Sequence, residues 1–233
     1  MTFQIEKSGK TALVFGASGL VGSYCVANLL QHDAYDKVIT FGRRDTGLRH
    51  PKITHYVVDF DDVLPWAELV AGDDLFCCLG TTRKKAGSKE AFRKVDFDYV
   101  LEIAQFAAVN NVNQFLLVSA VGADPNSMFF YNQVKGELEK AIQKLDFWST
   151  HILQPSVLLG SRSEIRILEK ATKIITRVVD RVTNGNLKEY RPIEAHRVAN
   201  AMVQLAQYLE KGVHFHPSHN LIEMTSEDGL TPV

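Results

Sequence analysis

Cysteine is scarce in this chain, and its positions leave no set that could build a disulfide framework or a zinc site. The 233 residues contain only Cys25, Cys77 and Cys78, an odd number with two of them adjacent. Disulfide-stabilised secreted domains are dense in cysteine, and zinc sites space their ligands characteristically. The pattern therefore predicts a protein of a reducing compartment. We expect Cys77 and Cys78 to be core residues of an apolar strand.

The chain also lacks an excess of charge and a long apolar run. Its formal net charge is -1, so composition gives no electrostatic basis for binding nucleic acid or an anionic membrane surface. No apolar run reaches the length of a membrane span, and the first ten residues contain no apolar signal-peptide core. These absences favour a cytoplasmic protein. The 45% hydrophobic content suffices for a single packed domain over residues 1–233.

What the chain does contain is a glycine-rich turn near its start. Gly16, Gly19 and Gly22 stand at three-residue intervals between an apolar run over 10–15 and an apolar-periodic stretch over 20–30. In such a strand-to-helix turn, the first glycine allows a sharp exit from the strand. The second lets backbone N–H groups approach a pyrophosphate, and the third lets the helix pack on the sheet. The context favours a dinucleotide site over the alternative of a plain tight turn.

Short apolar runs alternate with helical patterns through most of the chain. We expect strands over 10–15, 37–41, 54–58, 75–79, 114–119 and 150–153. We expect helices over 20–30, 92–107 and 129–145, with a weaker one that begins at Asp61 or Asp62 and ends at Val70. Nearly continuous apolar strands are typical of a parallel sheet covered on both faces. The predicted fold class is therefore α/β, a doubly wound Rossmann-type parallel sheet with helices on both faces.

The C-terminal third follows a different pattern. We expect the dinucleotide-binding core to span about 10–160 and a small C-terminal cap to span about 161–233, within one domain. Helices are predicted over 163–182 and 194–209, and the last stretch is predicted to be irregular, with one short strand over 221–224. His214, His216 and His219 lie close together there. We expect them in a solvated loop and not in a metal site, because no cysteine or acidic partner stands at ligand spacing.

Ligands of doubly wound sheets bind at the carboxyl ends of the strands. Arg43 and Arg44 follow the second expected strand, where an acidic residue would accept a hydrogen bond from the 2′-hydroxyl of NAD. Two guanidinium groups fit a 2′-phosphate instead, so the sequence predicts a preference for NADP(H) over NAD. The alternative is a pair of solvated surface arginines. Asp59, at the end of the third strand, would accept from the adenine amino group or cap the next turn.

A further group of residues carries acid–base chemistry. Tyr131 and Lys135 are four residues apart on an expected helix, so they share a face, and that helix follows a strand ending in Ser119. A phenol with a pKa of about 10 is a poor acid–base at neutral pH. A nearby ammonium favours the phenolate, and a serine hydroxyl would hold a substrate carbonyl. In the alternative, Tyr131 is a half-buried helix aromatic and Lys135 a solvated charge.

These features together resemble the short-chain dehydrogenase/reductase superfamily, and more closely its atypical NAD(P)-binding subgroup. The resemblance runs from about Lys10 to Arg197. It rests on Gly-Ala-Ser-Gly-Leu-Val-Gly, Thr-Phe-Gly-Arg-Arg, Cys-Cys-Leu-Gly-Thr-Thr and Tyr-Asn-Gln-Val-Lys-Gly-Glu. Many family members carry an asparagine in the helix after the fourth strand that supports a proton relay. This chain has Asp96 near that place.

The resemblance also implies cofactor contacts. Those with the pyrophosphate would come from Gly16, Ser18, Gly19, Leu20 and Val21. Those with the adenosine and ribose would come from Leu79, Gly80 and Thr81, and the nicotinamide carboxamide would face Pro155, Ser156 and Val157. Lys135 would also hydrogen-bond the nicotinamide ribose.

We therefore expect an NADPH-dependent oxidoreductase that reduces a small carbonyl compound. Tyr131 would donate the proton, Lys135 would tune it, and Ser119 would orient the carbonyl. The C-terminal part leaves little room for the substrate domain of a sugar-nucleotide epimerase. The alternative hypothesis is an NADP(H)-binding regulatory protein with little or no turnover that acts through a protein partner. Substrate identity, and the choice between monomer and homodimer, stay open at this stage.

Overall fold

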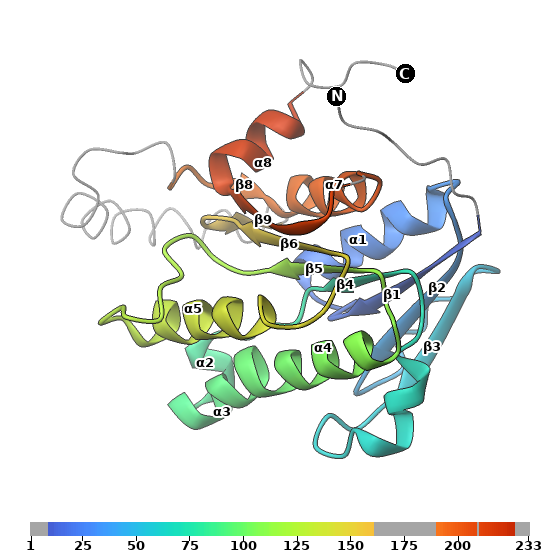
Figure 1. Ribbon diagram of the computed structural model, residues 1–233, viewed down its shortest axis with the longest axis horizontal. Coiled ribbons are helices and arrows are strands. Elements are labelled where there is room, and N and C mark those ends of the chain that lie inside the picture. The colour runs from blue at the N-terminus through green and yellow to red at the C-terminus, as the bar shows by residue number, and fades with distance from the viewer. Residues whose placement is uncertain (1–8, 161–189, 209, 227–233) are drawn as a thin grey trace.

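One large parallel sheet organises the chain (Figure 1). The computed structural model describes residues 9–160, 190–208 and 210–226. The sheet has seven strands in the order β3-β2-β1-β4-β5-β6-β9. They are β1 (Lys10–Phe15), β2 (Tyr35–Gly42), β3 (Ile53–Val57), β4 (Asp74–Cys77), β5 (Gln114–Val118), β6 (Ser149–Gln154) and β9 (Gly212–Pro217). The strand order reverses between β1 and β4, which places the ligand crevice of a doubly wound sheet there. The predicted fold class is confirmed.

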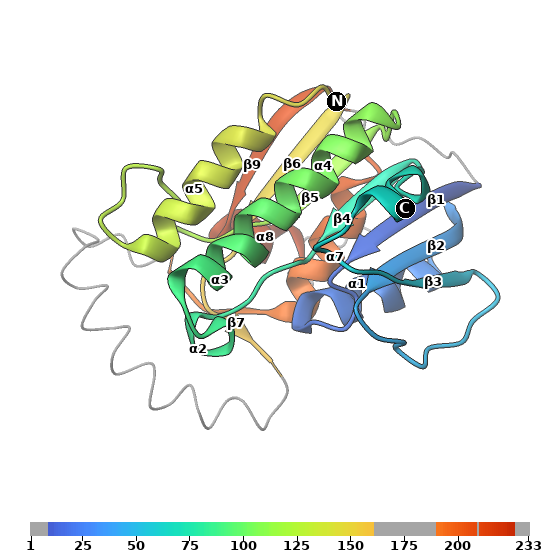
Figure 2. The same ribbon diagram turned by 90° about the horizontal axis from the view of Figure 1, so that it is seen from below.

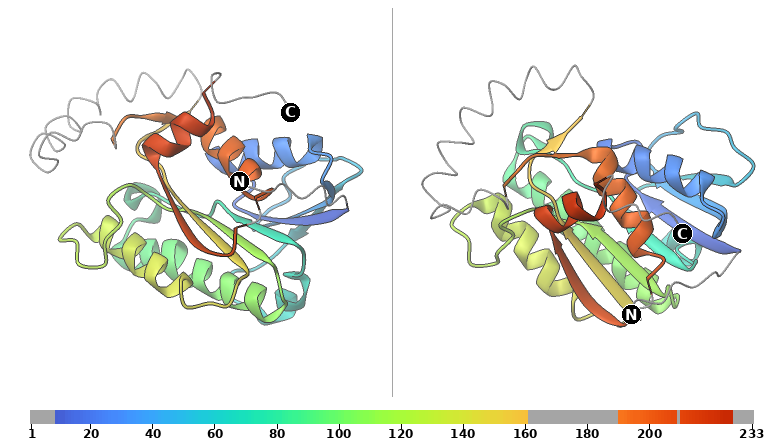
Figure 3. Two further views of the ribbon diagram at one scale, coloured as in Figure 1. Left: turned by 45° about the horizontal axis from the view of Figure 1, so that its top comes forward. Right: turned by 90° about the horizontal axis from the view of Figure 1, so that it is seen from above.

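Helices cover both faces of this sheet (Figures 1 and 2). One face carries α1 (Leu20–Gln31), α7 (Ala195–Leu205) and α8 (Ser218–Met224), which Figure 3 shows most clearly. The other carries α3 (Lys89–Arg93), α4 (Tyr99–Val109) and α5 (Phe130–Ile142). Successive side chains of a strand point to opposite faces, so Val14 joins the core under α1 and α7 while Leu13 and Phe15 join the core over α4 and α5. No helix among the described residues is long and apolar enough to cross a membrane.

A buried polar network ties the amino-terminal ends of the strands together. Lys10 Nζ lies 2.7 Å from Asp74 Oδ2, and the Tyr35 hydroxyl donates to the same oxygen at 2.6 Å. Gln114 Nε2 donates to Asp74 Oδ1 at 3.0 Å. Burial makes an unpaired charge costly, so these partners hold β1, β2, β4 and β5 in register at this edge. The opposite, carboxyl-terminal edge is thereby left for ligands.

The helical stretch after β4 differs from the expected regular helix. A short helix, α2 (Arg83–Ala86), precedes α3, and one π turn over Lys94–Asp98 joins α3 to α4. In the helix expected over 92–107, the apolar spacing puts Phe92, Val95 and Tyr99 on one face, but the structure buries Asp96 and Val100 in place of Val95 and Tyr99. A π turn holds one residue more than an α turn, so it rotates the buried face by one position. A pattern of 3.6-residue periodicity does not show such an insertion.

The C-terminal stretch is more regular than expected. The predicted strand over 221–224 is wrong, because these residues belong to α8, and the strand of this region is β9. β9 pairs with β6 along the edge of the main sheet, and a small parallel pair, β7 (Leu158–Leu159) and β8 (Ile193–Glu194), lies outside it. The helix expected over 194–209 is α7. The helix predicted over 163–182 lies outside the described residues.

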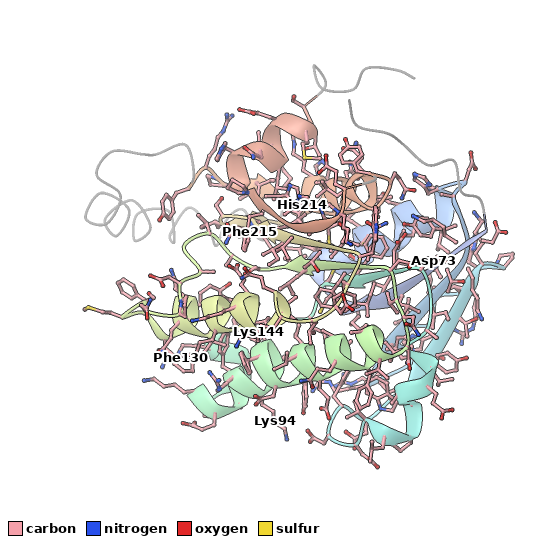
Figure 4. The ribbon with its side chains drawn as sticks, viewed as in Figure 1. Asp73, Lys94, Phe130, Lys144, His214 and Phe215 are labelled. Carbon is pink, nitrogen blue, oxygen red and sulfur yellow. The ribbon has the colours of Figure 1, made fainter. Side chains whose placement is uncertain are left out.

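Three histidines meet where β6 and β9 pair. His151 Nδ1 lies 3.0 Å from His216 Nε2, and the His151 and His214 rings stack with centroids 5.2 Å apart. The prediction of a solvated loop is wrong for His214 and His216, which lie on β9; Figure 4 labels His214 beside Phe215. Burial lowers the pKa of His151 to about 3 and that of His216 to about 4, so both are packed neutral. Among the described residues, no cluster suits a metal ion.

We predict that acid destabilises the protein through His151. The folded pKa lies below the ordinary value of about 6.5, so the unfolded chain binds more protons between roughly pH 6.5 and 3. The free energy of unfolding should fall by up to about 1.4 kcal/mol per pH unit through this group as pH drops across that window. Urea unfolding between pH 7 and 5 measures this slope. His151→Gln should flatten it and the exposed-histidine control His50→Gln should not; equal slopes in all three would contradict the assignment.

Candidate functional site

The glycine turn between β1 and α1 has the close packing of a phosphate cradle. Gly16 has a φ of +81°, and a Cβ there would stand 2.5 Å from the carbonyl oxygen of Cys78, which follows β4. A Cβ on Gly22 would lie 2.1 Å from the Gly16 carbonyl oxygen. Neither position accepts a side chain, because real Cβ atoms do not approach backbone this closely. The start of α1 is therefore held directly against the ends of β1 and β4.

The N-terminus of α1 is open to an anion. Gly19 begins the helix without a side-chain cap, and the first turn holds no acidic residue. The Gly19 N–H donates to the Gly16 carbonyl at 2.9 Å, whereas the N–H groups of Leu20 and Val21 belong to the first turn, which has no intrahelical acceptor for them. Ser18 is exposed on the same turn. Free N–H groups and the positive end of the helix dipole suit a pyrophosphate, so the cradle fits the group that the sequence predicts.

Arg43 and Arg44 follow β2, next to this cradle in the sheet. Both side chains are exposed, and none of the ion pairs among the described residues engages their guanidinium groups. The His55 ring fixes the backbone of this turn, since its Nε2 lies 2.9 Å from the Arg44 carbonyl oxygen and its Nδ1 lies 2.7 Å from Thr40 Oγ1. The turn is thus anchored while the two cationic side chains are left accessible.

Asp59 lies two residues after β3 and shapes a turn. Its Oδ1 accepts the Asp61 N–H at 2.9 Å, and its carbonyl accepts the Trp66 indole N–H at 2.9 Å. These contacts match the turn-capping alternative. The side chain is exposed at the same edge as the arginines, so the predicted adenine contact stays a prediction.

A buried ion pair lies beneath the carboxyl ends of β4 and β5. Lys135 Nζ stands 2.9 Å from Asp96 Oδ1, with 4% and 1% of the two side chains exposed. Asp96 Oδ2 accepts the Thr81 N–H at 2.8 Å, and a Cβ on Gly80 would lie 3.3 Å from Asp96 Oδ1. Burial alone would lower the pKa of Lys135, but the Asp96 charge and hydrogen bond hold that pKa above its ordinary value. The lysine is therefore charged, and its charge is matched by a carboxylate.

Tyr131 lies one turn before Lys135, near the N-terminal end of α5, where Figure 4 labels its neighbour Phe130. Its ring is 39% exposed and contacts Phe92 of α3 at a centroid distance of 5.6 Å. Burial around the hydroxyl raises the pKa of Tyr131; the Lys135 charge opposes this and the Asp96 charge adds to it. The phenol is thus held in its protonated form at neutral pH. The alternative of a solvated Lys135 is wrong, since that side chain is buried, whereas its half-buried aromatic is observed; the catalytic role of the pair stays a prediction.

Ser119 follows β5 and is bonded to a buried acid that the sequence reading did not single out. Its hydroxyl donates to Glu139 Oε1, and Gln154 Nε2 donates to both carboxylate oxygens of Glu139 at 3.1 Å. Burial raises the pKa of Glu139, partly offset by these hydrogen bonds and by Lys135. The hydrogen-bond geometry directs the Ser119 hydroxyl proton at Glu139. Ser119 then offers lone pairs to a ligand and no proton.

A second glycine contact positions the helix that carries these groups. A Cβ on Gly136 would stand 2.3 Å from the backbone between Asp124 and Pro125, so the loop after β5 crosses α5 directly at this glycine. Asn132 reinforces the crossing, because its Nδ2 donates to the Gly122 carbonyl at 2.7 Å. Tyr131 and Lys135 flank this contact. The loop therefore fixes the depth of both side chains relative to the strand ends.

The remaining predicted cofactor residues lie at the same edge. Leu79, Gly80 and Thr81 follow β4, and the Cys77 thiol before them is fully buried, which raises its pKa to about 12 and makes it a core group. Pro155, Ser156 and Val157 follow β6. The Ser156 hydroxyl donates to the Arg191 carbonyl, so it holds the segment leading into β8. Their predicted contacts with cofactor stay predictions.

A protein-family model described as NAD(P)H-binding matches residues 16–207. The chain belongs to this family. The match begins at the first glycine of the cradle and covers all the strands described above except β1 and β9. The family match thus supports a nicotinamide cofactor as the ligand of this chain.

Curated relatives support the same assignment and correct one expectation. The chain is 39% identical to protein HTATIP2 of Rattus norvegicus over 165 residues, covering 69% of this chain and 68% of that protein. It is 32% identical to the mitochondrial protein FMP52 of Candida albicans over 225 residues, covering 94% and 96%. The resemblance to the atypical short-chain dehydrogenase/reductases is thereby confirmed. The prediction of a cytoplasmic protein is wrong, since relatives that match nearly the whole chain are named mitochondrial.

Solved structures share the fold at low identity. MoeE5 in complex with UDP-glucuronic acid and NAD has a TM-score of 0.67 at 15% identity, covering 88% of this chain and 75% of that one. The ADP-L-glycero-D-manno-heptose-6-epimerase of Helicobacter pylori has a TM-score of 0.66 at 16% identity, covering 92% and 79%. At these identities the likeness shows the Rossmann-type fold and says nothing of substrate.

We predict that Gly16→Ala abolishes cofactor binding, because the new Cβ would collide with the Cys78 carbonyl and displace the cradle. Gly47→Ala is the matched control, since Gly47 has a φ of +70° with nothing within 4 Å. The Gly47→Ala variant should lose about 1–2 kcal/mol of stability from backbone strain alone, because its new Cβ collides with nothing. Calorimetric titration with NADPH, together with thermal unfolding, separates the two effects. Wild-type affinity in Gly16→Ala would show that the cofactor binds elsewhere.

Proposed function

We propose that the protein is an NADPH-dependent oxidoreductase that reduces a small carbonyl compound. The observation that carries the proposal is the placement of a protonated phenol, Tyr131, one helical turn from a buried charged lysine, Lys135. Both lie at the carboxyl edge of the sheet, the edge that carries the glycine cradle. A structural tyrosine would need no buried lysine beside it, and a buried charge is costly to keep.

The cofactor would be held by residues already at this edge. The cradle of Gly16, Ser18, Gly19, Leu20 and Val21 would take the pyrophosphate, and Arg43 and Arg44 the 2′-phosphate. The segments following β4 and β6 would lie along the rest of it: Leu79, Gly80, Thr81, Pro155, Ser156 and Val157. A bound nicotinamide supplies hydride to the substrate carbon and is oxidised in doing so.

The chain's own groups would manage the proton. As the carbonyl carbon gains hydride and the C=O double bond breaks, negative charge develops on the oxygen, and the Tyr131 hydroxyl gives it a proton. The phenolate left behind is stabilised by the Lys135 ammonium and is reprotonated from water. Ser119, whose hydroxyl donates to Glu139, would accept a hydrogen bond from the Tyr131 hydroxyl or from the alcohol product.

A second function is supported by that same serine. Reductases of this kind are expected to use serine as a donor to the carbonyl, and here the proton is committed to Glu139. This favours the alternative of an NADPH-binding regulatory protein with little or no turnover, acting on a protein partner. The first experiment below distinguishes the two.

We predict that NADPH consumption across a panel of aldehydes, ketones and quinones is substrate-dependent and falls about 10²–10⁴-fold in Tyr131→Phe, because the variant lacks the general acid. Tyr208→Phe makes the same substitution at a tyrosine distant in sequence from Tyr131. This control should keep the rate. Tight NADPH binding without turnover in any variant would favour the regulatory function. Equal turnover in wild type and Tyr131→Phe would remove Tyr131 from the mechanism.

We predict a selective loss of NADPH affinity on replacing both Arg43 and Arg44 by alanine. Hydrogen bonds to a charged group contribute about 1.5–3 kcal/mol, so NADPH should weaken about 10- to 100-fold more than NADH. Arg49→Ala is the control, because Arg49 lies in the same connection but is paired with Asp45 at 2.8 Å. Fluorescence titration with both cofactors measures the ratio, and equal weakening of the two would contradict the 2′-phosphate assignment.

A further inference from the structure

The buried carboxylate beside Lys135 changes what that lysine can do. In a tyrosine–lysine pair, the ammonium charge favours the phenolate and so lowers the phenol pKa. Here Asp96 Oδ1 is 2.9 Å from Lys135 Nζ, and both side chains are almost fully buried. Opposite charges at this distance cancel most of the electrostatic effect that either one has on a neighbouring group. Tyr131 therefore faces an ion pair and not a cation.

The position of Asp96 is fixed independently of the lysine. It stands in the π turn over Lys94–Asp98, and its second oxygen accepts the Thr81 N–H at 2.8 Å. The other elements packed here add little charge. The Cys77 thiol of β4 has a pKa raised to about 12 and is neutral, and Glu139 of α5 is bonded to Ser119 and Gln154. Burial raises the pKa of Tyr131 most, and the charges that act on this pKa are Lys135, which lowers it, and Asp96, which raises it.

We propose that Asp96 is a positioning residue that neutralises the Lys135 ammonium and so keeps Tyr131 protonated, setting the site to give a proton to a carbonyl and not to take one from an alcohol. The inference rests on the proposed function for its catalytic meaning. The proposed effect of Asp96 on the pKa of Tyr131 does not depend on turnover. If Asp96 served only stability, it would not need to contact both Lys135 and the loop after β4.

The test removes the Asp96 charge alone and then together with the Lys135 charge, and measures the pKa of Tyr131 each time. The pKa of Tyr131 is followed by NMR on protein with carbon-labelled tyrosine, with the Cζ signal assigned by Tyr131→Phe. Asp96→Asn keeps one acceptor oxygen but removes the charge, so it should lower the Tyr131 pKa by about one unit or more. The double variant Asp96→Asn with Lys135→Met removes both charges and should leave that pKa within about half a unit of wild type. Asp98→Asn, an exposed acid of the same turn, should change nothing.

The outcomes separate cleanly. An unchanged Tyr131 pKa in folded Asp96→Asn, or a rise of about one unit or more in the double variant, would overturn the proposal, because the lysine charge would then be acting unmatched. If Asp96→Asn alone does not fold, the double variant decides. Where turnover exists, Asp96→Asn should also shift the pH profiles of alcohol oxidation and of carbonyl reduction together toward lower pH. Absence of turnover in every protein would count against the proposed function and leave the NMR result standing.

Discussion

The ion pair between Lys135 and Asp96 is the interaction on which the candidate site depends. It joins α5 to the π turn before α4, and through Thr81 it joins both to the loop after β4. Removing one partner of a buried pair typically costs about 3–5 kcal/mol, because the other charge is left unmatched. The depth of α5 against the sheet is therefore set electrostatically at one point and sterically at another, where the Asp124–Pro125 backbone crosses Gly136. Tyr131 lies about one helical turn before these two constraints.

The sheet carries a second buried lysine–aspartate pair at its other edge. Lys10 and Asp74 open β1 and β4, as Lys135 and Asp96 lie beneath the far ends of β4 and β5. The two pairs differ in what surrounds them. Lys10 and Asp74 are bonded to Tyr35, Gln114 and the Ala206 carbonyl, all within the packed core, whereas the Lys135 pair lies next to a tyrosine that is 39% exposed. The first pair stabilises strand order, and only the second has access to a ligand.

Much of the fold could be predicted from the sequence, and the errors have physical causes. The strands at 10–15, 37–41 and 114–119 are apolar runs that only a covered parallel sheet buries, and the glycine spacing marks α1. Asp96 was noted by resemblance, but its burial was not predicted, because a π turn shifts the buried face by one residue and helical periodicity does not encode that shift. The strand β9 was not predicted, because its partly buried positions include His214 and His216, which are not apolar. Glu139 had a usable signal: it continues the four-residue series of Tyr131 and Lys135 along α5.

The two buried acids, Asp96 and Glu139, both affect which proton is available to a substrate oxygen. Asp96 matches the Lys135 charge that would favour the Tyr131 phenolate, and Glu139 accepts the hydrogen bond that Ser119 would otherwise donate to a carbonyl. Under the proposed function, the hydrogen left for a substrate oxygen is the one on Tyr131. A carbonyl oxygen becomes basic only as hydride arrives at carbon, so a single weak acid held close to it interacts more strongly with the transition state than with the ground state. Under the proposed function, a Tyr131 that keeps its proton at neutral pH favours the rate of carbonyl reduction there over the rate of alcohol oxidation.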